Sequence, residues 1–308
     1  MNLVDANHCW RRYWKSLHVL WMIFCMPAYG HSEWMHDTML GGGARSLSMG
    51  EGGAAVIEGV EGLYWSPANI AWGVDTEILL GKTNWIADNN QQTAAIQRPM
   101  GGYGVFGATL NMQAISDFET RDANGELTGK DSWMTGQVGV SWAHVLGATL
   151  AGGVSVGYKM QDGLGVGKKG MALGLGITRK TGDFCLGVSA MDLALVQPAY
   201  QFSGSWTYSK SNQAITLNGG GILRDGENRL GCGIEACTGK MLRLRAGYMV
   251  PIELNGLKSF SNLTAGLGIV FGRFEFDYAF VPLGELGQVH RFQFINLIPG
   301  DIHRNATY

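Results

Sequence analysis

The chain has 308 residues, of which 16% are charged, 47 are glycine and 7 are proline, and its formal net charge at pH 7 is −2. This composition is too polar for a bundle of transmembrane helices and too poor in charge for a typical soluble enzyme. No basic stripe exists, so nucleic acid is not an expected partner. Membrane β-barrels have such compositions, because apolar lipid-facing residues alternate along each strand with polar residues that face the lumen.

The first 30 residues are predicted to be a cleaved signal peptide. A basic stretch, Arg11–Lys15, precedes the apolar run Leu17–Cys25, and Ala28-Tyr29-Gly30 forms a small-x-small cleavage site. The alternative is a single transmembrane anchor, but spanning a bilayer needs roughly 20 apolar residues, and the run is shorter. We therefore expect the mature chain to begin near residue 31, outside the cytoplasm.

Residues 31–75 are predicted to form a separate hatch segment in the mouth of a barrel. The segment contains three consecutive glycines, Gly41–Gly43, and towards its end the run Tyr64-Trp65-Ser66-Pro67-Ala68-Asn69-Ile70-Ala71-Trp72-Gly73. Ser66 is suited to cap a helix whose first residue is Pro67, because proline lacks the N–H that would go unpaired there. Gly73 is suited to end that helix. The alternative is an N-terminal strand followed by a turn.

From residue 76 the sequence predicts antiparallel strands joined by turns. In Arg273–Phe280, four aromatic residues alternate with charged and small ones, a period of two that is typical of strands with one apolar face. Polar and glycine-containing turns such as Asn124-Gly125 separate the runs. We expect an all-β transmembrane barrel over 76–298, with about 14 strands that begin near residues 76, 91, 102, 132, 149, 170, 183, 201, 213, 228, 241, 261, 273 and 289.

Three other segments are assigned from the same pattern. The polar stretches 116–131 and 196–212 are interpreted as modest loops, and 196–212 is also the weakest of the expected strands. Residues 299–308 are expected to be a polar tail, since Pro299-Gly300-Asp301 ends the last alternating run.

Catalytic motifs do not survive inspection of their context. Gly153-Val154-Ser155-Val156-Gly157 matches a hydrolase pattern, but that motif requires a sharp strand-to-helix turn, and here it lies within an alternating strand. Ser141 and His144 are three residues apart and would face opposite sides of a strand. His31 and His36 are the only histidines of the mature chain with a spacing suited to metal. We expect no enzyme activity, no cofactor and no metal site.

Charged residues in the C-terminal strands have two interpretations. They are expected either to line a functional charged lumen or simply to face water and pair across neighbouring strands. The second is the simpler explanation. The residues concerned are Arg243, Arg245, Arg273, Glu275, Asp277 and Arg291.

Two stretches carry a resemblance to a known family. Gly43-Ala44-Arg45-Ser46-Leu47-Ser48-Met49-Gly50 followed by Tyr64–Ala71 resembles the start of PorV/PorQ-like outer-membrane proteins, which belong to the wider FadL-type superfamily of long-chain fatty-acid transporters. The run Phe276–Gly287 followed by His290-Arg291-Phe292 is similar to the closing hairpin of the same family. Ser66 replaces the asparagine that the family pattern usually has, and Glu51 stands where small residues are usual.

The resemblance implies a 14-stranded barrel with an N-terminal hatch in the outer membrane of a Gram-negative-type bacterium. It favours a non-enzymatic role in protein export or surface attachment, with secretion-system proteins or exported cargo as partners besides outer-membrane lipid. The alternative is a FadL-like channel for hydrophobic small molecules such as long-chain fatty acids. In either case the residues expected to form the hatch and to contact a ligand are Tyr64, Trp65, Ser66, Pro67, Ala68, Asn69 and Trp72.

Overall fold

The computed structural model describes residues 42–85, 89–122, 124–163, 166–195, 198–224, 228–239, 241–252, 263–282 and 287–300. The expected signal peptide, the start of the hatch segment and residues 301–308 of the tail lie outside these ranges. So do His31 and His36. No helix within the described residues is long and apolar enough to cross a membrane.

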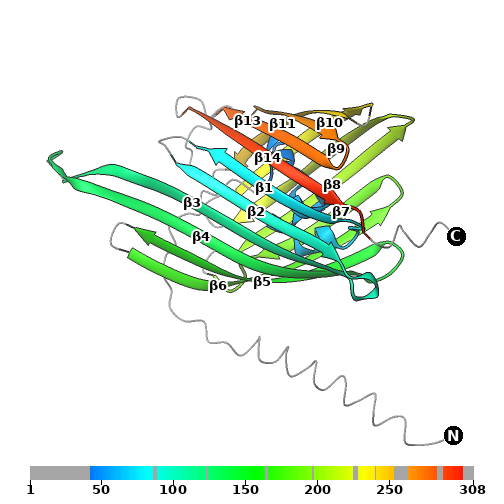
Figure 1. Cartoon of the computed structure of the whole chain (residues 1–308), viewed down its shortest axis with the longest axis horizontal. Helices are drawn as coiled ribbons and strands as arrows, with labels where there is room; N and C mark the ends of the chain where they lie inside the picture. Colours follow the sequence, from blue (N-terminus) through cyan, green and yellow to red (C-terminus); the bar gives the residue numbers. More distant parts are fainter. Residues whose placement is uncertain are drawn as a thin grey trace, which may run out of the picture. The chain divides into compact units, whose positions relative to one another are not determined.

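Fourteen antiparallel strands close into a barrel, in which each strand pairs with its neighbours in sequence and β1 pairs with β14 (Figure 1). The strands are β1 (Thr76–Asn84), β2 (Asn90–Pro99), β3 (Val105–Arg121), β4 (Leu127–Val145), β5 (Leu150–Gly163), β6 (Val166–Thr181), β7 (Phe184–Met191), β8 (Ala199–Lys210), β9 (Gln213–Arg224), β10 (Asn228–Thr238), β11 (Leu242–Ile252), β12 (Leu263–Phe271), β13 (Phe274–Pro282) and β14 (Gln288–Ile298). The predicted fold class and strand number are confirmed.

The two faces of the wall differ in polarity, as the period of two predicts. In β7, Phe184, Leu186 and Val188 are more than half exposed on the outside, whereas Cys185 and Ser189 are buried on the inside. The same alternation recurs around the barrel, so the outer face is apolar and the inner face is rich in amides, hydroxyls and charges. Such a wall is suited to hydrocarbon outside, and its closure leaves no strand edge unpaired in the lipid.

Two predicted loops are strands in the structure. Residues 116–131 belong mainly to β3 and β4, which run past their neighbours as a two-stranded ribbon with Asn124-Gly125 at its tip. Residues 199–210 form β8, paired on both sides. The interpretation of 116–131 as a loop was wrong because a strand that extends beyond the membrane has polar residues on both faces, so polarity no longer distinguishes it from a loop. The strand expected to begin near residue 201 is confirmed by β8, and the alternative interpretation of 196–212 as a loop was wrong.

The connections define two ends of the barrel. At the end where β1 begins and β14 finishes, which we call the terminal end, the turns are short, as at 182–183 and 211–212. The longest connections, 192–198 and 253–262, lie at the opposite end, which we call the far end. The β3–β4 ribbon extends from the far end (Figure 1).

The N-terminal segment, defined here as residues 42–75, lies inside the barrel. It contains the helix α2 (Ala44–Ser48) and the 3₁₀ turns η1 (Ala54–Val56), η2 (Val60–Tyr64) and η3 (Pro67–Ile70); a further 3₁₀ turn, η4 (Gly101–Tyr103), joins β2 to β3. The four elements of the segment contact strands all around the barrel. A segment that touches every side of a closed wall can only lie within it.

Closure of the wall has a direct electrophoretic consequence. We expect the folded protein to migrate faster in an unboiled SDS gel than after boiling, because the closed hydrogen-bonded ladder resists the detergent until heat opens it. The measurement is a pair of gel lanes that differ only in heating. Equal migration of the two samples would contradict a closed barrel.

Candidate functional site

Inward-facing glycines allow the backbone of the N-terminal segment to lie directly against the wall. A Cβ atom on Gly231 or Gly247 would overlap backbone atoms of Gly50, and one on Gly187 would overlap the carbonyl of Ala55. On the other side of the barrel, Gly153 makes the same room for Pro67. Glycine within these strands therefore marks close approach of another backbone, which is one of its known uses in sheets.

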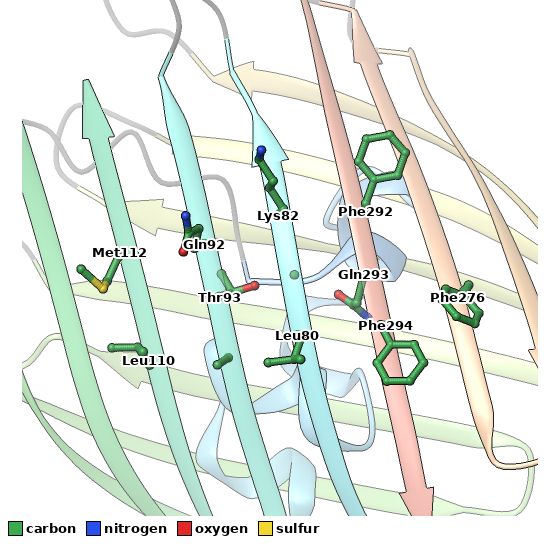
Figure 2. A pocket seen from close by; sticks show the side chains of 12 residues that line it. Leu80, Lys82, Gln92, Thr93, Leu110, Met112, Phe276, Phe292, Gln293 and Phe294 are labelled. Atoms are coloured by element: carbon green, nitrogen blue, oxygen red, sulfur yellow. The ribbon is translucent and has the colours of Figure 1, made fainter. Parts of the chain in front are cut away.

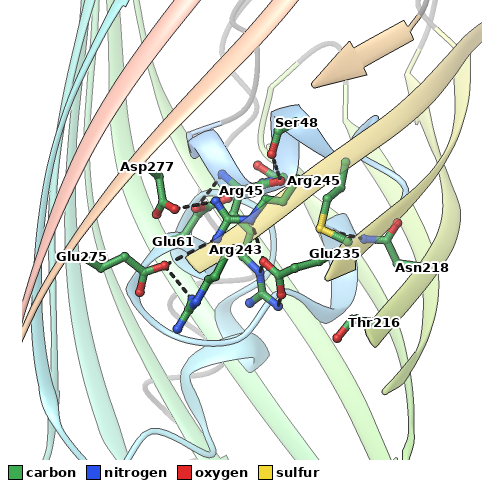
Figure 3. A network of polar contacts seen from close by, with 12 residues as sticks. Arg45, Ser48, Glu61, Thr216, Asn218, Glu235, Arg243, Arg245, Glu275 and Asp277 are labelled. Carbon is green, nitrogen blue, oxygen red and sulfur yellow. Dashed lines mark hydrogen bonds and ion pairs between the residues drawn. The ribbon is translucent and has the colours of Figure 1, made fainter. Parts of the chain in front are cut away.

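The segment is also held by a network of buried ionic contacts (Figure 3). Arg45 of α2 donates two hydrogen bonds to Glu235 of β10, at 3.0 and 2.7 Å. Arg245 of β11, whose side chain is fully buried, donates to the same carboxylate at 2.6 Å and to Asp277. Arg243 donates to Glu275 at 2.6 Å. Three arginines, from α2 and β11, thus pair with three carboxylates, from β10 and β13.

Glu61 connects this network to the start of α2. Its carboxylate accepts hydrogen bonds from the backbone N–H groups of Ser46, at 2.7 Å, and Arg45, at 3.3 Å. These are donors in the first turn of the helix, which have no partner within it. Gln293 of β14 donates to Glu61 at 3.0 Å and accepts from the backbone N–H of Ala44 at 2.9 Å. The orientation of α2 is therefore fixed by one residue of the segment and one residue of the wall.

Two polar side chains of the segment, those of Arg45 and Tyr64, have pKa values raised by their surroundings. The carboxylate of Glu235 raises the pKa of the Arg45 guanidinium above its usual value, so Arg45 stays protonated. Burial raises the pKa of the Tyr64 hydroxyl, so the phenol stays neutral. The hydroxyl therefore donates a hydrogen bond to the backbone carbonyl of Ala94, at 2.8 Å.

A cavity of about 250 Å³ lies beside this network at the terminal end. It is lined by residues of the N-terminal segment and of β1, β11, β13 and β14, namely Arg45, Glu58, Gly59, Val60, Glu61, Trp72, Gly73, Val74, Asp75, Glu77, Arg243, Glu275, Asp277, Ile295 and Leu297. Its lining mixes charged side chains with the apolar side chains of Trp72, Ile295 and Leu297. The cavity is suited to water or to a small molecule with both polar and apolar parts.

Most of the predicted hatch residues are enclosed by protein. The Trp65 side chain is 3% exposed, and its indole N–H donates to the Ser46 hydroxyl at 3.1 Å. Asn69 donates to the carbonyl of Ala54 at 3.0 Å. Pro67 and Ala68 pack against the wall at Gly153 and Gly176. These residues organise the segment in this conformation.

Tyr64 and Trp72 are the more accessible members of the predicted set. Both are only partly buried. Trp72 lines the cavity at the terminal end, and the ammonium of Lys180 lies 5.3 Å from the centre of one face of its ring. If a ligand reaches the segment from the terminal end, Trp72 is the predicted residue that it meets.

The expected cap at Ser66 is wrong in detail. Residues 67–70 form a 3₁₀ turn, and the Ser66 side chain makes no capping hydrogen bond. The hydroxyl is buried against Gly176 of β6 and is turned toward the wall. A turn of four residues needs fewer capped N–H groups than an α-helix, and packing against the wall decides the rotamer. Pro67 does stand at the first position of the turn, as predicted.

The residues of the candidate catalytic motifs lie within regular strands, as their sequence context predicts. Ser155 lies in the middle of β5, paired on both sides, and Ser141 and His144 lie on opposite faces of β4. Among the described residues, no group of three histidine, cysteine or acidic side chains is placed to hold a metal ion. Of the charged residues proposed for the lumen, Arg273 lies apart, with its guanidinium over the Phe274 ring.

Sequence reasoning missed several residues of the network. Glu235, Gln293 and Thr264 were not singled out, although each faces inward and contacts the N-terminal segment. The one signal for Glu235 was its place in a strand whose inward positions, Gly231 and Gly233, are glycines. Glu51, noted as unusual, is 2% exposed and forms an ion pair with Arg229 of β10 at 3.0 Å.

No protein-family model and no curated protein sequence matches the chain. Solved structures do match it. The toluene transporter TbuX of Ralstonia pickettii is 14% identical, with a TM-score of 0.61 over 83% of this chain and 98% of that one. The monoaromatic hydrocarbon channel CymD is 12% identical, with a TM-score of 0.60 over 85% and 98%. A Pseudomonas aeruginosa FadL homologue is 9% identical, with a TM-score of 0.55 over 83% and 98%.

The chain therefore has the fold of FadL-type outer-membrane barrels. The likeness extends over nearly the whole length of each of these proteins and includes the closed barrel of 14 strands. At these identities it is a likeness of fold. None of the comparisons supports the finer resemblance to PorV/PorQ proteins.

Loss of the central arginine should destabilise the barrel. We expect Arg245→Met to lower the free energy of unfolding by about 3–5 kcal/mol, because it leaves the buried carboxylates of Glu235 and Asp277 without their shared partner. The measurement is urea unfolding of the folded protein in lipid vesicles, followed by tryptophan fluorescence. Arg243→Met is the matched control, since Arg243 is 29% exposed and contacts one carboxylate. Equal losses for the two variants would contradict the central role of Arg245.

Filling the space at an inward glycine should displace the N-terminal segment. In Gly231→Ala the new methyl group overlaps the Gly50 carbonyl, and such overpacking typically costs about 1–3 kcal/mol. We expect faster tryptic cleavage after Arg45 in the folded protein. Gly219→Ala on the adjacent strand is the control, because its nearest contact would be 3.8 Å away. Identical cleavage rates for the two variants would refute the close contact.

Proposed function

We propose that the protein is an outer-membrane channel that admits small hydrophobic molecules, with the N-terminal segment as a movable hatch. The observation that carries the proposal is the position of the N-terminal segment inside the lumen. The segment contacts strands on every side of the barrel, and the chain leads from it into the wall at Asp75, just before β1. A segment held by side-chain contacts and close packing rather than by strand pairing can move without opening the wall.

The class of molecule is proposed from the matched structures, which include a toluene transporter and a monoaromatic hydrocarbon channel. Features of this chain are compatible with that class. A cluster of apolar side chains, among them Leu63, Ile70 and Leu79, lies where η2 and η3 meet the wall. Tyr64 and Trp72 flank this cluster, and we propose that they contact the permeant molecule when the segment moves.

Orientation follows from the connections. Barrels of this kind have short turns on the periplasmic side and longer loops outside. The terminal end would then face the periplasm, and the cavity beside Trp72 would be the exit. The β3–β4 ribbon would extend into the medium, where its polar faces are solvated.

The alternative role in protein export or surface attachment, with secretion-system proteins or cargo as partners, has less support. It rested on the likeness of two short stretches to PorV/PorQ proteins. Co-purification of the tagged protein from outer membranes would test it, with mass spectrometry of what accompanies it. Recovery of secretion-channel proteins or exported cargo in stoichiometric amounts would favour export over transport.

Transport is tested with proteoliposomes that contain the full mature chain. We expect them to take up radiolabelled toluene or a long-chain fatty acid faster than empty vesicles. Arg45→Ala should raise ionic conductance in planar bilayers, because α2 loses its contact with Glu235 while Glu235 keeps Arg245. Arg98→Ala, on the outer face of β2, is the control. Uptake no faster than in empty vesicles for both molecules would refute the proposal.

A further inference from the structure

A groove of about 500 Å³ lies on the outer face of the wall, across β14, β1, β2 and β3 (Figure 2). It is separate from the lumen, because β1 is paired without interruption to both β14 and β2. Its volume falls within the range of roughly 300–1,000 Å³ that is typical of small-ligand sites. An indentation of this size in a lipid-facing surface must be filled by some part of the membrane.

The side chains around the groove explain why it exists. Outward rows across the strands place Ala94 of β2 between Leu80 and Leu110, so one small residue stands between two large ones. Phe292 and Phe294 form one bank on β14, where the Phe294 ring packs against Phe276 at 4.9 Å between centroids. Leu110 and Met112 form the opposite bank on β3. The outward side chains of floor and banks are apolar, as an acyl chain requires, whereas Gly81, Thr93 and Gln293, which also line the groove, lie at inward-facing positions.

One end of the groove is not apolar. Lys82 points outward two residues before the far end of β1, and its register partner Gln92 stands beside it on β2 (Figure 2). No carboxylate within the described residues forms an ion pair with Lys82. A lysine on the lipid face costs about 2–4 kcal/mol at the middle of a bilayer and close to zero near its surface. Lys82 therefore lies at the level of the headgroups.

We propose that this groove binds one lipid of the leaflet at the far end, with an acyl chain between the two aromatic and aliphatic banks and a phosphate of the headgroup against Lys82 and Gln92. The apolar trough and the cation at its end match the two parts of an anionic lipid. Because the far end is the end that we have proposed to face the medium, the lipid is the phosphorylated glycolipid of the outer leaflet. The site does not depend on what passes through the lumen.

The test is lipid retention by the full mature chain in a non-ionic detergent, measured by native mass spectrometry with lipid A as the probe. We expect one lipid A to remain bound to the wild type. Lys82→Gln should weaken binding about fivefold, in line with the contribution of one lysine to an anionic membrane surface. Lys210→Gln is the matched control, since Lys210 is exposed near the terminal end.

A second pair of variants tests the shape of the groove separately from the charge of Lys82. Ala94→Phe fills the floor between Leu80 and Leu110 and should abolish retention. Ala108→Phe adds the same bulk to the outer face of β3, between Ile96 and Val140, and should leave retention unchanged. Wild-type retention in both Lys82→Gln and Ala94→Phe would overturn the proposal. So would preferential retention of phosphatidylglycerol, because that would place the lipid in the other leaflet.

Discussion

The pairing of β1 with β14 is the interaction on which the rest of the structure depends. Hydrocarbon offers no hydrogen bonds, so a sheet with two free edges would leave a row of backbone groups unsatisfied at a cost of several kcal/mol each. The register from Thr76 opposite Ile298 to Asn84 opposite His290 removes both edges. The same seam holds the N-terminal segment, because Glu77 of β1 accepts from the Val60 N–H and Gln293 of β14 binds the start of α2.

Two kinds of contact then fix the position of the N-terminal segment inside the barrel. Glycines of β7, β10 and β11 let backbone lie on backbone, so at those points position is fixed by shape. Between α2 and the C-terminal strands, position is fixed by charge, since Arg45 and Arg245 share one carboxylate of Glu235. Close backbone packing resists small displacements of the segment. Removing one partner of a buried ion pair is costly, whereas replacing both partners by apolar residues changes the stability little. These contacts therefore define the position of the N-terminal segment more strongly than they add to the free energy of unfolding.

The sequence predicted the wall well because a strand between lipid and water repeats every two residues. The run that ends at Phe280 shows this: its aromatic residues face outward in β13, as their spacing requires. The number of strands and most of their starts followed from that signal and from the turns. The signal failed where the environment changes, so residues 116–131 of the ribbon were interpreted as a loop, and the strand expected near residue 201, which is β8, was the least distinct of the series.

The interior was much less predictable. That Pro67 begins a helical turn could be predicted locally, but the direction of the Ser66 hydroxyl depends on Gly176, more than a hundred residues away. The meeting of Arg45 with Glu235 depends on how the N-terminal segment is placed against β10, and no local pattern encodes that placement. Inward glycines in β10 and β11 were the one available indication that another backbone comes close.

The β3–β4 ribbon has a consequence for how the chain can vary. Between Ala114 and Trp133 its two strands pair only with each other, and its tip is closed by Asp122, whose carboxylate accepts from the N–H groups of Asn124 and Glu126 at 2.9 Å. The ribbon's cross-strand and turn hydrogen bonds are therefore made without the rest of the barrel. Its sequence and length can drift, or accept an inserted peptide, while the wall and the N-terminal segment keep all of their contacts. Among the described residues, the ribbon that extends beyond the wall is thus a part that the rest of the fold constrains little.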